Sequence, residues 1–180
     1  KAHPEVDLDM TFSDELVDLH QNKIDFAFRL GELADNSSLI AMPLMQTHLL
    51  ACVSSRYFEQ YGSPESLINL GKHKLILMTP LYSSRALRLF FQKQKLKLDE
   101  TPMHRSNDIE GVYQAVMADL GVGLLLDVAI QKELHDGDII PVLPNLKPHL
   151  PQKKLYLIFQ KDQQSSLKQN LFKAHIRAEI

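Results

Sequence analysis

The sequence predicts an α/β protein, because segments with strand patterns alternate with segments with helix patterns along most of the chain. Apolar residues at every second position, or in short continuous runs bounded by turn residues, indicate the strands. Apolar residues at helical spacing, preceded by Ser, Asp or Asn, indicate the helices. With 180 residues, of which 44% are hydrophobic, the chain can bury the core of one domain or of two small lobes.

The first part of the chain predicts a strand, a helix and a second strand. Apolar and polar residues alternate in Val6–Phe12, which indicates a strand with one polar face. Ser13 can cap the helix that follows, whose inner stripe is Leu16, Val17 and Leu19. Ile24–Phe28 is almost continuously apolar, as in parallel strands buried on both faces. We expect a right-handed βαβ unit, followed by a loop over Arg29–Ser38.

The remainder continues this alternation. Further strands are expected at His48–Val53, His73–Met78, Thr101–Arg105, Gly121–Leu126, Ile139–Leu143 and Leu155–Phe159. Helices are expected over Ser63–Leu70, from Ser83 or Ser84 to about Gln94, from the cap at Ser106–Asp108 to about Leu120, from an Asp127 cap to Leu134, and from Leu167 to about Ala178 after a Ser165 cap. The proline-rich stretch Pro144–Pro151 is expected to be an exposed connection.

Charge and cysteine content narrow the classes of function. The formal net charge is -2 and basic residues do not cluster, so a nucleic-acid-binding surface on this chain is not indicated. The semi-basic stretch Arg85–Lys97 is interleaved with leucine and phenylalanine, which is typical of an amphipathic helix. Cys52 is the single cysteine and lies in an apolar run, so we expect a buried thiol in a reducing cytoplasm.

No targeting segment is recognisable in the sequence. The chain contains no apolar stretch long enough to cross a membrane and no signal peptide, so we expect no membrane contact. It begins with Lys1 rather than with methionine, which indicates a processed product or a fragment.

The usual signatures of catalysis are missing. The sequence has no Gly-x-Gly-x-x-Gly motif after a strand, no Walker loop and no Gly-x-Ser-x-Gly elbow. Its eight histidines are scattered and none lies four residues from another, so a metal site is not indicated. Asp7, Asp9 and Asp25 could form a carboxylate pair, but solvation and capping explain them more simply. The sequence therefore predicts a protein that is not an enzyme and that holds neither a metal nor a cofactor.

Three loops that follow predicted strands are rich in hydroxyl groups and helix caps. They are Thr11–Ser13, Thr79–Ser84 and Ser106–Asp108. Ligands of open α/β sheets bind beyond the carboxyl ends of strands, and free N–H groups at helix starts suit an anion. Capping alone explains each loop, but their matching positions favour a shared cleft.

Arg29 follows a predicted strand directly and could pair with a ligand carboxylate. The alternative is a structural ion pair of Arg29 with one of the acidic residues Asp25, Glu32 and Asp35.

An ordered set of short motifs resembles the effector-binding domain of LysR-type transcriptional regulators. Each motif is weak alone, but together they cover essentially the whole chain in the family's order. The motifs are His3–Leu8, Leu16–Leu19, Ile24–Asp35, Ser38–Ala41, Ser54–Phe58, Tyr61–Pro64, Asn107–Asp108, Ala118–Gly123 and Leu155–Phe159.

The resemblance implies a fold like that of type 2 periplasmic binding proteins, with two α/β lobes joined by two crossing strands. The crossings would lie near Thr47–Leu50 and Phe159–Lys161. Lobe I would then hold residues 1–47 and 160–180, and lobe II would hold residues 48–159. A small effector molecule would lie in the cleft between them, in contact with residues at positions that match the family's site: Thr11, Ser13, Arg29, Gly31, Pro80, Tyr82, Ser83 and Asn107.

Two departures from the family pattern affect these expectations. Asp127 stands where the family usually has proline, so the start of that helix can differ. The family's domain also begins with a strand and a helix upstream of the residue matching His3, and that strand lies between Val6–Phe12 and Ile24–Phe28. We therefore expect either that these two strands pair directly or that a neighbouring chain fills the gap, because unpaired central strands leave buried amides unsatisfied.

The resemblance implies an effector-sensing domain that controls transcription in the cytoplasm as part of a homo-oligomer, a dimer or a tetramer. DNA would be bound only through the family's N-terminal domain, which is absent from this sequence. A periplasmic solute-binding protein of the same fold is the first alternative and an enzyme that acts on small acids is the second. Arg29 and the capped loops favour an anionic effector.

Overall fold

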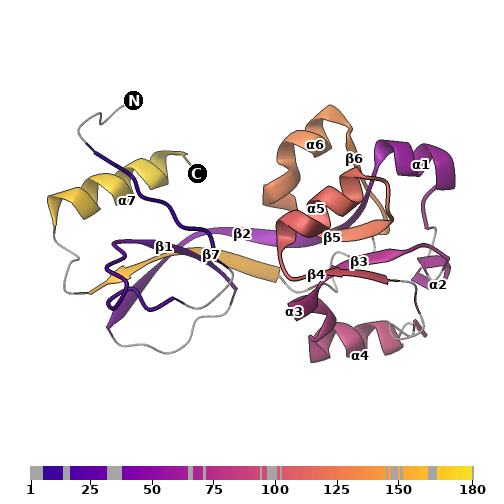
Figure 1. Ribbon diagram of the computed structural model, residues 1–180, viewed down its shortest axis with the longest axis horizontal. Helices are drawn as coiled ribbons and strands as arrows, with labels where there is room; N and C mark the ends of the chain where they lie inside the picture. Colours follow the sequence, from indigo (N-terminus) through magenta and orange to yellow (C-terminus); the bar gives the residue numbers. More distant parts are fainter. Residues whose placement is uncertain are drawn as a thin grey trace.

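The chain folds into two lobes that share one long strand (Figure 1). The structure is a computed structural model that describes residues 6–13, 17–31, 38–64, 67–70, 72–93, 95–96, 101, 103–144, 146, 150, 152–161 and 166–179. The strands follow the order β1-β7-β2-β5-β3-β4, with β6 paired to β2. The predicted α/β class is confirmed.

Strands and helices alternate over most of the described chain. The strands are β1 (Ala27–Leu30), β2 (Leu39–Ser54), β3 (Leu75–Met78), β4 (Met103–Ser106), β5 (Val122–Leu126), β6 (Ile139–Pro141) and β7 (Gln152–Gln160). The helices are α1 (Ser55–Tyr61), α2 (Leu67–Leu70), α3 (Thr79–Tyr82), α4 (Arg85–Lys93), α5 (Ile109–Met117), the 3-10 helix η2 (Asp127–Ile130), α6 (Gln131–Asp136) and α7 (Leu167–Glu179).

Strand β2 connects the two lobes. Its first part, Leu39–His48, pairs antiparallel with β7, and its last part, Leu49–Ser54, pairs antiparallel with β5 and β6. The sequence predicted only the second part. Pro43 lacks an amide hydrogen and the register shifts between Pro43 and Met45, so the first part carries no regular period-two pattern.

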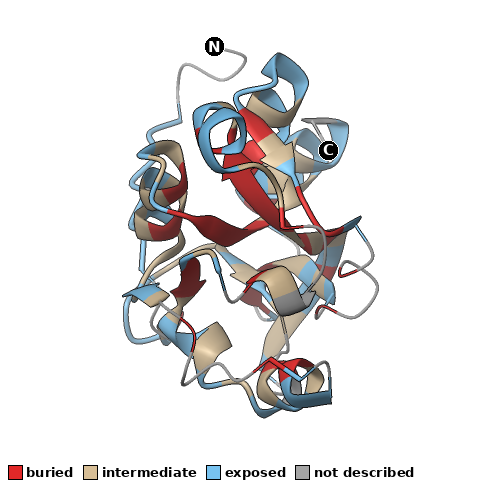
Figure 2. Cartoon of the chain, turned by 90° about the vertical axis from the view of Figure 1, so that its right-hand side faces the viewer, coloured by how far each residue is buried: buried red, intermediate tan, exposed pale blue. Residues whose placement is uncertain are grey.

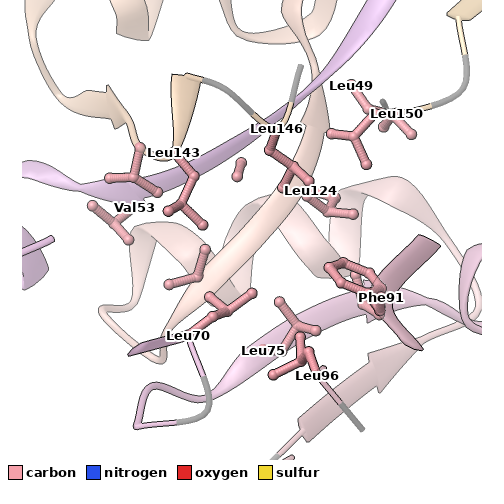
Figure 3. Packing of buried hydrophobic residues seen from close by; sticks show 14 of the residues in the cluster. Leu49, Val53, Leu70, Leu75, Phe91, Leu96, Leu124, Leu143, Leu146 and Leu150 are labelled. Atoms are coloured by element: carbon pink, nitrogen blue, oxygen red, sulfur yellow. The ribbon is translucent and has the colours of Figure 1, made fainter. Parts of the chain in front are cut away.

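The larger lobe contains α1 to α6, η2, β3 to β6 and the end of β2. Its core has two clusters of buried side chains, one on each side of the β2-β5-β3 sheet. Figure 2 shows these strands buried beneath exposed helices, and Figure 3 shows how side chains from distant segments converge in the first cluster. The labelled members of that cluster are Leu49, Val53, Leu70, Leu75, Phe91, Leu96, Leu124, Leu143, Leu146 and Leu150.

The smaller lobe contains β1, β7, α7 and the first part of β2. Helix α7 covers one face of this sheet through Phe172, whose ring stacks on Phe26 with centroids 4.4 Å apart. Phe26 in turn meets the ring of Phe159 edge-on at 6.0 Å. Among the described residues, the buried cluster beneath α7 consists of Met42, Leu157 and Phe159. This lobe therefore has a much smaller core than its neighbour.

The strand predicted at Val6–Phe12 is wrong. The segment is extended but pairs with no strand of the described chain, and its apolar side chains are exposed, up to 90% for Phe12. The family resemblance places another strand between this segment and β1, and no described segment occupies that position. The expected direct pairing with Ile24–Phe28 is therefore wrong as well. The expected filling of the gap by a neighbouring chain stays a prediction.

The second predicted strand begins later than expected. Residues Asp18–Lys23 form turns, and the Ile24 amide still donates to the Leu19 carbonyl at 2.9 Å. Pairing with β7 therefore begins at Ala27 rather than at Ile24, and it is antiparallel. The expected burial on both faces is wrong, because Phe28 is exposed, and the described residues form no βαβ unit here. The predicted helix after Ser13 lies partly outside the described residues, and its described part forms turns rather than helix.

The helices and strands predicted in the larger lobe are mostly confirmed, within a few residues at the ends. The exposed connection predicted at Pro144–Pro151 is wrong, because Leu146 and Leu150 are buried in the first core cluster. Ser84 caps α4 by accepting a hydrogen bond from the Leu87 amide, and Asp108 caps α5 by accepting one from Gly111. Helix α1 was missed, although Ser54 caps it through the Tyr57 amide. Helix α3 was also missed, because Pro80 suggested only the end of a strand.

The single cysteine is buried, as predicted. Cys52 is 0% exposed near the end of β2, and burial raises the pKa of its thiol to about 12. A thiol with such a pKa is almost never ionised at neutral pH, so it acts as a small apolar side chain of the core.

Gly121 is predicted to be required for the start of β5. Its φ is +154°, and an added Cβ would lie 2.2 Å from the Lys74 carbonyl oxygen, which accepts the Val122 amide. We expect Gly121→Ala to lower the free energy of unfolding by about 3 kcal/mol in urea titrations, through backbone strain and the clash. Gly137→Ala is the control for the clash and should cost less, since Gly137 also has a positive φ of +81° but an added Cβ there meets nothing within 4 Å. An equal loss in both variants would contradict this account.

The open edge of β1 is predicted to promote self-association. Phe28 is 53% exposed and Leu30 is 44% exposed on this four-residue strand, which among the described strands pairs with β7 only. We expect the chain to associate at high concentration and Phe28→Lys with Leu30→Lys to reduce that association, as followed by sedimentation velocity. Leu89→Lys, which changes an equally exposed leucine of α4, should have no effect. A wild-type chain that stays monomeric at every concentration would refute the prediction.

Candidate functional site

The carboxyl ends of three parallel strands gather the candidate residues of the larger lobe. Strand β3 pairs in parallel with both β4 and β5, so all three strands end at the same edge of the sheet. Thr79 follows β3, Asn107 follows β4 and Asp127 follows β5. In Figure 1, α3 lies on the side of the larger lobe nearest to β7. This edge is where ligands of α/β sheets usually bind.

The turn after β3 carries Pro80 and Ser83. Proline fits the first turn of α3, where no amide hydrogen is needed, and the Ser83 amide closes the turn on the Thr79 carbonyl at 3.0 Å. The Thr79 hydroxyl donates to the Ser106 carbonyl at 3.1 Å and so ties the end of β3 to the end of β4. The structure thus brings Pro80 and Ser83 close to Asn107, and all three are exposed.

Tyr82 is in contact with two guanidinium groups. The Arg88 guanidinium is 5.3 Å from the centre of its ring, and that of Arg105 is 4.9 Å away. Such cation-π contacts fix the ring while leaving the charges able to act on their surroundings. The turn at the end of β3 is therefore positively charged, which suits an anionic ligand.

In the loops before α4 and α5, side chains of the loops themselves bind the backbone amide groups at the helix starts. The Asp108 carboxylate accepts the Gly111 amide at 2.6 Å, and the Ser106 hydroxyl accepts the Asp108 amide at 3.2 Å. Ser84 accepts the Leu87 amide in the same way at the start of α4. The capping alternative thus explains part of each pattern, and fewer amide groups remain for an anion than the sequence suggested.

A cluster at the crossing of the lobes was missed by the sequence analysis. The Asp127 carboxylate accepts hydrogen bonds from three groups: the Thr47 hydroxyl at 2.6 Å, the His48 amide at 3.0 Å and the Val128 amide at 2.8 Å. Its second oxygen lies 3.3 Å from Nδ1 of His48. Asp127 was predicted to cap a helix, but it instead joins the end of β5 to the crossing part of β2. The sequence offered one signal of this different role, since Asp127 stands where the family usually has proline.

These hydrogen bonds favour the charged form of Asp127. Burial raises the pKa of its carboxyl group, but the hydrogen bonds from Thr47, His48 and Val128 outweigh burial, and the pKa is lowered overall. Thr47 is fully buried at this point, so its hydroxyl depends on Asp127 for a partner. The cluster therefore holds β2 against β5 where the chain passes between the lobes.

Arg29 and Gly31 lie at the end of β1 in the smaller lobe. Arg29 donates from Nη2 to the Val17 carbonyl at 3.0 Å, so this nitrogen has a structural role. Of the carboxylates considered as its partners, Asp25 pairs with Lys168, and residues 32 and 35 lie outside the described residues. Gly31 adopts a φ of +98° as the chain leaves the strand.

The structure places Thr11 and Ser13 in the exposed extended segment that precedes residue 14. Because this segment pairs with no described strand, its position relative to β1 is not fixed by a sheet. Contact of these two residues with an effector stays a prediction.

Strand directions show how the two lobes meet. Strand β7 starts at the crossing, where Gln152 pairs with His48, and β1 runs antiparallel to it. The Gly31 amide donates to the Lys154 carbonyl, so β1 ends about 7 Å along the strand from the crossing. Strand β5 also runs toward the crossing, because Leu126 pairs with Leu49. The carboxyl ends of β1 and of β3, β4 and β5 therefore approach the crossing from opposite sides.

Comparison with known families decides the relationship. The family model described as "LysR substrate binding domain" matches residues 1–180 of the chain. The chain belongs to this family. The resemblance that the motifs indicated is therefore confirmed.

Curated relatives of this LysR substrate-binding domain are transcriptional regulators. An uncharacterized HTH-type transcriptional regulator of Escherichia coli K12, YhjC, is 26% identical over 94% of the chain and 56% of its own length. The HTH-type transcriptional regulator CrgA of Neisseria meningitidis serogroup C is 25% identical over 79% of the chain and 47% of its own length. The chain thus spans about half the length of the curated relatives it matches.

Solved structures of the family share the fold. The regulatory domain of CrgA from Neisseria meningitidis matches 93% of the chain and 80% of its own, with a TM-score of 0.74 and 22% identity. The full-length AphB of Vibrio cholerae matches 99% of the chain and 59% of its own, with a TM-score of 0.71 and 20% identity. The predicted two-lobed fold of the periplasmic-binding-protein type is confirmed.

The described residues of this LysR-family domain form neither a membrane-spanning helix nor a cluster of metal ligands. Within the described residues, no helix is both long and apolar enough to traverse a bilayer. The same residues contain no group of three or more His, Cys, Asp or Glu side chains that could hold a metal ion.

Asp127 is predicted to stabilise the crossing in its charged form. We expect Asp127→Asn to lower the free energy of unfolding by about 1 to 2 kcal/mol at neutral pH, because Thr47 loses its charged acceptor. Because folding lowers the pKa of the Asp127 carboxyl group, its charged form stabilises the folded state at any pH above the pKa of the unfolded chain. This contribution is lost as the pH falls through the pKa of the folded state. The difference between the two proteins should therefore shrink below about pH 4 in urea titrations.

The matched control is Asp136→Asn, which removes a more exposed carboxylate that pairs with Lys132 on α6. We expect this change to cost less than about 0.5 kcal/mol. A difference between wild type and Asp127→Asn that grows on acidification would show that the charged carboxylate does not stabilise the crossing.

Proposed function

We propose that this chain senses a small organic anion between its lobes and thereby controls transcription by the regulator to which it belongs. The observation that supports this most is the convergence of strand ends: β1 from one lobe, and β3, β4 and β5 from the other, end toward the crossing of β2 and β7. Both lobes thus offer the edge at which α/β sheets bind ligands.

We assign the effector contacts of the larger lobe to Pro80, Tyr82, Ser83 and Asn107. The hydrogen bond between Thr79 and the Ser106 carbonyl supports this, because it holds these loops together. The guanidinium groups beside Tyr82 supply positive charge for an anion. In the smaller lobe we propose contacts from Arg29, Gly31, Thr11 and Ser13, with Arg29 offering the guanidinium nitrogen that does not bind Val17.

The sensing mechanism follows from the two-lobed arrangement. We propose that the lobes rotate about the Thr47–Asp127 contact. The first lobe boundary, after residue 47, is kept as the sequence predicted, whereas we move the second from residue 160 to just before Gln152, because β7 pairs with the Leu39–His48 part of β2 along its length. An effector that binds both lobes more tightly when they are closed shifts the population toward that state. The relatives are HTH-type regulators, which supports DNA binding through a part of the protein outside the matched region.

The same relatives support the remaining proposals. A regulator of transcription acts where the chromosome is, so we propose that the protein works in the cytoplasm as a homodimer or tetramer and without enzymatic activity. The relatives' HTH-type names favour this function over that of a periplasmic solute-binding protein.

A screen of small carboxylates tests the proposed effector site. We expect one to raise the midpoint of thermal unfolding by several degrees, since a ligand at a hundredfold its Kd stabilises by about 2.7 kcal/mol. Asn107→Ala and Ser83→Ala should each weaken binding about tenfold or more, because each removes a hydrogen bond to a charged ligand. Titration calorimetry with the purified chain measures both effects.

Ser63→Ala is the control, because this serine lies in the connection between α1 and α2 rather than at the carboxyl ends of the strands. It should leave the affinity unchanged. Stabilisation by neutral or cationic compounds only would refute the anionic effector. Carboxylate binding that is insensitive to both Asn107 and Ser83 would refute the assigned position.

A further inference from the structure

A hollow of about 450 Å³ lies between α7 and the sheet of the smaller lobe, away from the crossing. Its volume falls within the range of small-molecule sites in proteins, about 300 to 1,000 Å³. The lining residues are Ile40, Ala41, Met42, Pro43 and Phe159 from the sheet, and Asn170, Lys173, Ala174 and Arg177 from α7. None of them is among the residues assigned to the effector site.

The floor of the hollow is apolar. Met42 and Phe159 are 8% and 3% exposed, and Ile40 is half-buried beside them. Ile40 and Phe159 pair across β2 and β7, so their side chains lie on the same face of the sheet. Among the described residues, no strand pairs with the other edge of β2 before Leu49, which leaves the hollow open on that side.

The wall formed by α7 is polar and positively charged. Asn170, Lys173, Ala174 and Arg177 recur at helical spacing and form one stripe along the helix. The stripe that packs on the sheet is a different one and includes Phe172. Ala174 lies in the middle of the wall, and its small side chain leaves the space that a larger residue would fill.

Two cations face this apolar floor. The Lys173 ammonium lies 4.7 Å from the centre of the Phe159 ring, so it is held at the floor by a cation-π contact. Arg177 lies one turn further along α7, and the described lining residues include no carboxylate. A basic residue in the last turn also complements the helix dipole, but that role does not require an apolar hollow beside it.

We propose that this hollow is a second ligand site, which takes an organic anion with a flat apolar body and one carboxylate or sulfonate group. The apolar body lies on Ile40, Met42 and Phe159, and the anionic group receives hydrogen bonds from Arg177 and Asn170 beside the Lys173 charge. This site does not depend on the proposed effector site, because the two share no residue.

Calorimetry of the 180-residue chain with 2-naphthoate as the probe tests the proposal. We expect one site, and at least tenfold weaker binding of the neutral analogue 2-naphthamide, which cannot form charge-assisted hydrogen bonds. Because the chain has no tryptophan, the fluorescence of the naphthyl group gives a second readout. Equal binding of the amide, or no binding of 2-naphthoate, would refute the anion site.

Matched variants on α7 and β7 locate the probe. Arg177→Met should weaken binding about tenfold, whereas Lys154→Met, which removes an exposed cation of β7, should not. Ala174→Phe fills the hollow and should abolish binding, whereas Ala178→Phe, at an exposed position outside the hollow, should preserve it. Circular dichroism establishes that each variant is folded.

Two further results would overturn the proposal. Loss of 2-naphthoate binding in Asn107→Ala but not in Ala174→Phe would place the probe at the effector site. Self-association of the chain that Ala174→Phe abolishes and 2-naphthoate leaves unchanged would show that a second copy of the chain covers the hollow.

Discussion

The continuous pairing of β2 is the constraint on which the rest of the structure depends. One strand, Leu39–Ser54, pairs with β7 in the smaller lobe and with β5 and β6 in the larger lobe. Because neighbouring strands in these pairs run antiparallel, β2 sets the directions of β5 and β7, and β7 sets that of β1. The convergence of strand ends on the crossing therefore follows from the path of a single strand. Asp127 fixes this path where the partner of β2 changes, through Thr47 and His48.

The difference in core size between the lobes explains where the sequence predicted the fold well. In the larger lobe, buried strands such as Val122–Leu126 and capped helices such as Ile109–Met117 carry local signals that agree with their tertiary surroundings. In the smaller lobe, the alternation in Val6–Phe12 is a valid strand signal, but a strand forms only when another strand accepts its hydrogen bonds. The local sequence pattern therefore predicted a strand correctly where the described chain supplies a neighbouring strand to pair with it. The same kind of pattern failed at Val6–Phe12, where the described chain supplies none.

The candidate site was predictable to a similar extent. Hydroxyl groups and helix caps after strands indicated the loops Thr79–Ser84 and Ser106–Asp108, because ligands of open α/β sheets bind beyond the carboxyl ends of strands. The individual contacts Pro80, Ser83 and Asn107 came from the family resemblance and stay predictions. The Asp127 cluster was not predictable from local sequence, since its partners are about eighty residues away and meet only through the pairing of β2 with β5. Likewise, the hollow beneath α7 is lined by Ala174 from α7 and by Met42 and Phe159 from the sheet, and no spacing rule reveals that these distant segments line one hollow.

The two proposed sites lie on the same pair of strands. Met42 in the hollow is five residues from Thr47 at the crossing, about 16 Å along β2, and β7 pairs with β2 over the whole distance. A ligand beneath α7 can influence the crossing only if its affinity differs between the lobe arrangements, and the influence must then be reciprocal. Packed strands transmit such a difference through their register and tilt rather than through a chain of side chains. The bulge between Pro43 and Met45 lies on this route and is the point at which the pairing of β2 with β7 is least regular.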